Sequence, residues 1–88
     1  MDSAAFILAV EEKLAPVSPM AKPVIERQLA QMGLTREMLS PRQAEMLTRR
    51  VAEALAMFLG PSGAEMARSI MLKELRKRAP DYFTAQGL

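Results

Sequence analysis

The basic residues near the C-terminus have the types and the spacing that come closest to a site for chemistry. Within six positions the chain places Lys73, Arg76, Lys77 and Arg78. Cations clustered in this way bind phosphate groups, either on a nucleic acid or on an anionic membrane surface. They also stabilise the negative end of a helix dipole if a helix ends there. No aromatic residue for stacking and no Asn or Gln for reading base edges lies among them, which favours the helix-end interpretation.

Catalysis has few candidate side chains in this sequence. The 88 residues include no Cys and no His, which excludes thiolate nucleophiles, disulfides and the zinc sites built on these residues. Glu11 and Glu12 are adjacent, so on a helix they point about 100° apart and make a poor acid–base pair. Ser18, Ser40 and Ser62 are better explained as helix caps than as nucleophiles. We therefore predict a protein that is not an enzyme and that has no cofactor and no metal site.

Methionine is unusually frequent, with eight residues in 88. Flexible thioether side chains suit an adaptable apolar surface that binds a partner helix, although they also fill gaps in a core. Met46 and Met57 lie off the main apolar face of their expected helix, and Met71 and Leu72 lie beside the face of Ile70. A helix that is apolar on two sides needs two layers of neighbours. In so short a chain we expect the second layer to be another copy, in a homodimer.

The expected partner-binding surface combines apolar side chains with cations at its rim. Its residues are Phe6, Met46, Met57, Met71, Leu72, Arg49 and Arg50. Buried apolar area would supply affinity, and the charged rim would supply orientation. The leading hypothesis is a small non-catalytic protein–protein interaction module, an adaptor or a regulatory subunit. The alternatives are a nucleic-acid-binding regulator and, third, a peripheral membrane binder, both using the basic cluster.

Two helices in the second half of the chain must position most of these residues. The run Ser40–Gln43 is a capping box with proline at the first helical position, and it predicts a helix to about Leu59. The apolar face of this helix consists of Ala44, Leu47, Val51, Leu55 and Phe58. Gly60, followed by proline, ends it. A second capping box at Ser62–Glu65 predicts a helix to Ala79, and the short loop between the two predicts an antiparallel hairpin.

The first half predicts another pair of helices. The Ala-rich run after Ser3 favours a helix to Leu14 over a buried strand. Three prolines crowd the next stretch, so the second helix either begins near Pro23, the last of them, or is kinked there. Gly33 ends this helix, and residues 35–39 are expected to make one further helical turn.

These elements predict an all-α domain of four main helices, arranged as two helical hairpins over residues 3–32 and 41–79, plus one short helical turn. The domain is expected to span residues 1–80. The tail, residues 81–88, is expected to be poorly ordered unless Tyr82 and Phe83 dock on something. A domain this small buries little surface and is marginally stable alone.

Charge and hydropathy limit where such a protein works. The net charge of +2 comes entirely from residues 61–88, since residues 1–60 carry seven acidic and seven basic side chains. The chain is therefore not a polycation. No apolar run approaches the length needed to span a bilayer, and the start lacks the positive segment of a signal peptide. These features favour a cytoplasmic protein.

One stretch resembles a known family. Residues 14–25 read Leu-Ala-Pro-Val-Ser-Pro-Met-Ala-Lys-Pro-Val-Ile. This resembles a short helical module appended to bacterial serine/threonine kinases and response regulators, whose pattern is a Leu-Ala pair, then Gly-Pro-x-Ala-Lys/Arg and an aliphatic pair. Ser18 stands where the module has glycine, and Pro23 interrupts the aliphatic run. The resemblance implies a non-catalytic role in bacterial signalling or scaffolding.

Overall fold

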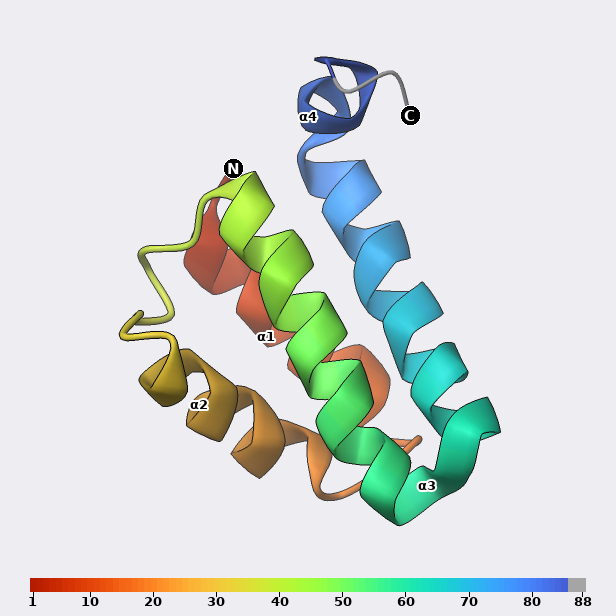
Figure 1. The fold of residues 1–88 in the computed structure, drawn as a ribbon. Helices are drawn as coiled ribbons and strands as arrows, with labels where there is room; N and C mark the ends of the chain where they lie inside the picture. Colours follow the sequence, from red (N-terminus) through yellow and green to blue (C-terminus); the bar gives the residue numbers. More distant parts are fainter. Residues whose placement is uncertain (86–88) are drawn as a thin grey trace.

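The computed structural model describes residues 1–85, which form helices and no strand (Figure 1). Within this part the helices are α1 (Ser3–Leu14), α2 (Ala21–Gln31), α3 (Pro41–Arg78) and α4 (Pro80–Ala85). Helix α3 bends sharply at Gly60, and its two halves run in opposite directions. The prediction of an all-α fold is confirmed.

Local sequence explains where the first two helices begin. The Asp2 carboxylate accepts a hydrogen bond from the Ala5 amide at 3.0 Å and caps α1. In α2 the first helical hydrogen bond runs from the Val24 amide to the Met20 carbonyl at 3.0 Å. Pro23 precedes this bond, in the turn where helical amides have no partner, so its missing N–H costs nothing. Of the two alternatives that the prolines left open, a helix that begins near Pro23 is correct.

The hairpin formed by the two halves of α3 begins as predicted and bends more tightly than predicted. Ser40 and Gln43 form the capping box, with hydrogen bonds of 3.2 and 2.9 Å. The expected three-residue loop is reduced to Gly60, because helical geometry resumes at Pro61. Proline suits this position, the start of a helical segment. The second capping box is therefore wrong: Ser62 lies inside the helix.

Two glycines make this bend possible. Gly60 has φ 73° and ψ −179°, a backbone conformation that essentially only glycine adopts. Gly63 lies one turn further on, and a Cβ atom there would collide with the side chain of Leu59. The second half of α3 can therefore fold back only because both positions lack a side chain.

The core lies where α1 and α2 meet the two halves of α3. Its fully buried large apolar side chains include Phe6, Ile7, Val10, Leu14, Ile25, Leu47, Val51, Leu55, Met71 and Leu75. Those of α1 recur at helical spacing, so one face of α1 points inward. Between α2 and α3, the Met38 amide donates to the Thr35 carbonyl at 3.1 Å and closes a turn. None of residues 35–39 is helical, so the helical turn expected there is corrected to a hydrogen-bonded turn.

The C-terminal segment is attached to the core. Phe83 of α4 is only 7% exposed, and its ring meets that of Tyr82 edge-to-face at 5.2 Å between centroids. The Tyr82 hydroxyl donates to a carboxylate oxygen of Glu45 at 3.0 Å, which joins α4 to the start of α3. Both aromatic residues thus pack against the rest of the chain. This docking is the condition under which the tail was expected to be ordered. The core extends beyond residue 80, and positions 86–88 of the tail lie outside the described residues.

Candidate functional site

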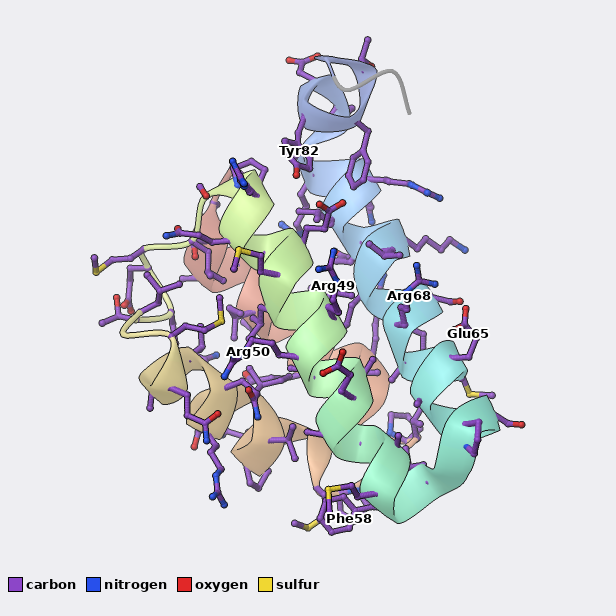
Figure 2. The ribbon with its side chains drawn as sticks, viewed as in Figure 1. Arg49, Arg50, Phe58, Glu65, Arg68 and Tyr82 are labelled. Atoms are coloured by element: carbon purple, nitrogen blue, oxygen red, sulfur yellow. The ribbon has the colours of Figure 1, made fainter. Side chains whose placement is uncertain are left out.

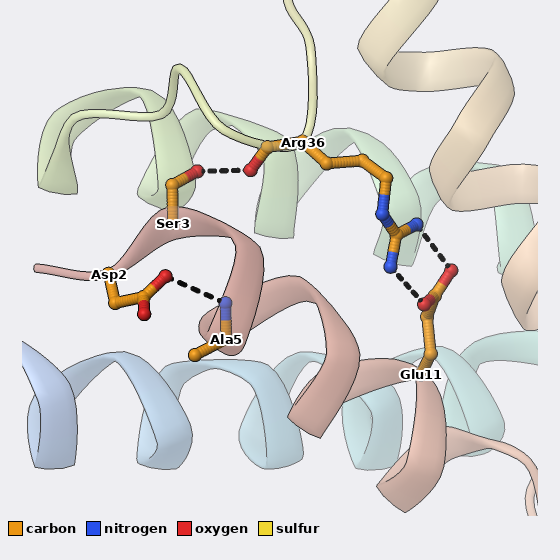
Figure 3. A network of polar contacts seen from close by, with 5 residues as sticks. All are labelled: Asp2, Ser3, Ala5, Glu11 and Arg36. Carbon is orange, nitrogen blue, oxygen red and sulfur yellow. Dashed lines mark hydrogen bonds and ion pairs between the residues drawn. The ribbon is translucent and has the colours of Figure 1, made fainter.

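A polar network holds the loop before α3 against α1 (Figure 3). Arg36 binds the Glu11 carboxylate through two nitrogens, at 2.6 and 3.0 Å. The Ser3 hydroxyl donates to the Arg36 carbonyl at 2.5 Å and accepts from the Leu39 amide at 2.9 Å. The hydrogen bond to Glu11 raises the pKa of Arg36 above its ordinary value. These bonds fix the position of the loop and of the α1 N-terminus.

A second buried carboxylate joins the ends of two helices. Glu74 is 1% exposed, and its oxygens accept from Lys13 Nζ at 2.6 Å and from Arg78 Nε at 2.7 Å. The hydrogen bond from Lys13 is the main reason that the pKa of Glu74 lies below its ordinary value, and the bond from Arg78 acts in the same direction. A carboxylate held in this way stays charged and fully paired.

Neither network has the form of a catalytic or metal site. Each carboxylate oxygen of Glu11 and Glu74 accepts a hydrogen bond from a cation, so these groups are occupied in holding helices together. Among residues 1–85 no three Asp or Glu side chains come close enough to hold a metal ion. The exposed apolar side chains offer a different kind of candidate site.

The most exposed large apolar side chains of α3 meet at one groove. Met57 is 87% exposed and Phe58 is 59% exposed. Phe58 lies just before the bend (Figure 2). The groove lies between α2 and this end of the first half of α3, and it holds about 450 Å³. Its lining consists of Met20, Pro23, Val24, Arg27, Gln28, Gln31, Ala54, Met57 and Phe58. We call this site the α2–α3 groove. Apolar residues form most of it, as in sites that bind ligands or partner side chains.

The polar rim of the α2–α3 groove belongs to α2 and is fixed by α3. Arg50 Nε donates to Gln28 Oε1 at 2.9 Å, and a terminal nitrogen of Arg50 donates to Gln31 Oε1 at 3.0 Å. The groove thus has an apolar floor and one ordered polar edge, and Arg27 is the only charged residue of its lining.

The structure separates the residues that we expected to form one partner surface. Met57 lines the α2–α3 groove, whereas Arg50 does not line it but donates hydrogen bonds to two glutamines that do. Met46 and Arg49 are exposed but do not line the groove, and Leu72 is partly buried. Met46 and Met57 remain uncovered by the hairpin, as expected for residues off the main apolar face.

Two residues of the expected surface are inside the core. Phe6 and Met71 are completely buried, so the expectation that they contact a partner is corrected. Phe6 lies on the α1 face that packs on α3, and Met71 follows Ala67 at helical spacing on the inner face of the second half of α3. For these two residues, core packing accounts for the apolar side chain.

The basic cluster is partly occupied within the chain. Arg78 bonds to Glu74, and the Arg76 guanidinium lies over the Phe83 ring, 5.4 Å from its centroid. Lys73 and Lys77 are exposed. Two of the four cations therefore have structural partners, which supports the interpretation of a helix end more than that of a phosphate site.

Several residues of the groove have no local sequence pattern that predicts their place there. Phe58 continues the spacing of Leu55 on the apolar face predicted for this helix, yet it lies in the last turn before the bend and is 59% exposed beside the start of α2. No local pattern marks Met20 or Arg27 as groove residues, because their position beside α3 depends on how α2 packs. The burial of Glu74 could have been found, since it stands one turn after Met71 on the inner face of α3.

No family model, curated protein or solved structure matches this chain. The resemblance of residues 14–25 to the helical module of bacterial kinases and response regulators therefore stays a prediction. In the structure this stretch is the turn between α1 and α2, together with the first residues of α2. The Ser18 hydroxyl accepts there from the Met20 amide at 3.1 Å. No helix of the described chain is both long and apolar enough to pass through a membrane.

Proposed function

We propose that this chain is a small, non-catalytic protein–protein interaction module that binds its partner in the α2–α3 groove. One observation carries the proposal: Met20 at the start of α2 and Met57 and Phe58 of α3 line a single concave apolar site, although each is at least 40% exposed. Exposed apolar residues that are scattered singly need no explanation, whereas a concave cluster is typical of a binding surface. A role as adaptor or regulatory subunit in bacterial signalling follows from this proposal together with the resemblance of residues 14–25.

Methionine and phenylalanine fit this role for a physical reason. Unbranched thioether chains can change rotamer to follow the shape of a partner, and an aromatic ring supplies a large buried area at small entropic cost. Covering such side chains releases about 25 cal/mol for each Å² of apolar surface removed from water. Burial of these side chains can therefore supply binding energy without any catalytic group.

The homodimer expected from the sequence stays a prediction alongside this proposal. Leu8, Met46 and Met66 are exposed outside the groove and offer other surfaces to a second copy. Light scattering across a dilution series measures the molar mass directly. We expect the variant Met57→Glu to have the same molar mass as the natural chain, because Met57 is assigned to a different partner.

The test compares two exposed methionines on either side of the bend. Met57→Glu places a charge in the α2–α3 groove, whereas Met66→Glu makes the same change at a side chain that is 55% exposed and outside this groove. Each variant, with circular dichroism to verify folding, is used to capture proteins from cells that express the chain. We expect proteins captured by the natural chain and by Met66→Glu to be lost with Met57→Glu. Equal capture by the two variants would exclude the groove.

A further inference from the structure

The polar edge of the α2–α3 groove offers hydrogen-bond donors. Arginine has no acceptor, so only the oxygen of each glutamine amide can face Arg50. Gln28 and Gln31 each turn this oxygen toward Arg50, at 2.9 and 3.0 Å. These bonds occupy the two oxygens, so what each glutamine can offer an occupant of the groove is the N–H groups of its amide. The guanidinium of Arg27, on the same edge, adds further donors.

The charge of the groove has one sign. No acidic residue lines it, and Arg27 is its one charged member. Glu26 is the neighbour of Arg27 in sequence, but it does not line the groove. Its negative charge instead helps to raise the pKa of Arg36. An occupant that fits this edge must therefore bring acceptors, and a carboxylate is the acceptor that also complements the positive charge.

We infer that the α2–α3 groove binds an acidic amphipathic helix of a partner protein, an inference that rests on the proposed function. Two apolar side chains of this helix, three or four positions apart, enter the groove beside Met57 and Phe58. A carboxylate on the flank of the same helix accepts hydrogen bonds from Arg27, Gln28 and Gln31. This arrangement is helix-in-groove recognition, with apolar anchors for affinity and one charged contact for orientation.

A helix fits better than an extended peptide for a backbone reason. The groove lies between two helices, and residues 1–85 contain no strand edge with which an extended peptide could pair. An extended segment would leave its backbone N–H groups without acceptors, because the edge of the groove supplies donors only. A helix satisfies these groups internally and presents side chains alone. A groove of about 450 Å³ lies within the range of sites that hold compact apolar groups.

A second copy of this chain fits the groove poorly. Groove-to-groove docking would bring two donor edges, each with its Arg27, against one another, and both would lack acceptors. Outside the groove, Leu8 and Met46 stand on different helical segments. Met66 lies in a second pocket with Ile70 and Glu65, but the Glu65 carboxylate is already paired with Arg68 at 3.2 Å. Complementary charge therefore favours a different protein as the partner.

The test is a selection from a display library of short helix-forming peptides with randomised surface positions. The full chain, the variant Arg27→Glu and the matched variant Arg42→Glu are immobilised, since Arg42 is exposed and lies outside the groove. We expect the natural chain and Arg42→Glu to enrich peptides with paired apolar residues and an Asp or Glu. Arg27→Glu should lose the acidic preference and bind the same peptides about fivefold more weakly, the size of one rim ion pair.

Three results would overturn the inference, and they separate it from the proposed function. Peptides that the natural chain enriches without acidic residues would contradict the inference and leave the groove as a binding site. No enrichment over an empty surface would contradict both. A dimer in light scattering that Met57→Glu dissociates would show that a second copy occupies the groove, and the acidic partner helix would then be wrong.

Discussion

Lys13 near the end of α1 donates a 2.6 Å hydrogen bond to Glu74 in the second half of α3, across 61 positions of sequence. This contact joins the first helix to the last long helical segment, and Arg78 completes it from one turn away. The charged pair is buried on one side only, because Glu74 is 1% exposed while the Lys13 side chain is half exposed. Lys13 can therefore return to water when the pair breaks, whereas Glu74 cannot.

Removal of both cations should destabilise the fold strongly. In Lys13→Ala/Arg78→Ala the Glu74 carboxylate stays buried without a partner, and the free energy of unfolding should fall by about 3–5 kcal/mol. Urea denaturation at neutral pH measures this change. Adding Glu74→Leu to the double variant removes the buried charge and should restore most of the loss. A triple variant that is no more stable than the double variant would show that the charge is not the cause.

The stability contributed by Glu74 should depend on pH in a defined direction. Because hydrogen bonds lower the pKa of Glu74 in the folded chain, the unfolded chain binds the proton more readily. The contribution is therefore complete above the ordinary value of 4.5 and is lost as the pH falls through the lower pKa of the folded state. Urea denaturation of the natural chain and of Glu74→Gln should differ most at neutral pH, and the difference should shrink below pH 4.5. A difference that is constant with pH would contradict the assignment.

The bend of α3 should depend on the backbone of Gly60. Gly60→Ala puts a Cβ atom on a backbone with φ 73° and ψ −179°, and it should lower the free energy of unfolding by about 1–3 kcal/mol. The space around the position is open, so strain rather than collision is the cause. Ser62→Ala is the control and should change stability by less than about 0.5 kcal/mol, because Ser62 does not cap a helix. A loss of about 1 kcal/mol there would instead support the capping box expected from the sequence.

The sequence predicted the elements better than their contacts. Capping residues act on amides three positions away, so Asp2 and the Ser40–Gln43 box determine helix starts that local reasoning can find. Phe58 lies on the helix face that buries Leu55 one turn earlier, yet its ring is exposed. Burial at this end of the helix depends on where α2 packs, which the local sequence does not encode. The groove edge likewise depends on Arg50 meeting the glutamines of α2, a contact between distant positions that no local pattern encodes.

The methionines should differ in their reaction with peroxide. Peroxide transfers an oxygen atom to the thioether and leaves water, and the rate follows exposure of the sulfur. Met57 at 87% exposed should therefore be oxidised early, whereas Met71, which is completely buried, should be protected until the chain unfolds. Peptide mass spectrometry at a series of times gives the rate at each site. Oxidation of Met71 in the folded chain as fast as that of Met57 would contradict the core described above.

Methyl NMR of the methionines tests the central claim most directly, because the side chains are themselves the probes. The chain, labelled at the methionine methyl groups, is titrated with the acidic helical peptide that binds it best. Met20 and Met57 should shift or broaden as the α2–α3 groove fills, while Met46 and Met66, which are exposed outside it, should keep their resonances. Shifts at Met46 or Met66 with none at Met20 and Met57 would place the partner on another face and contradict the account.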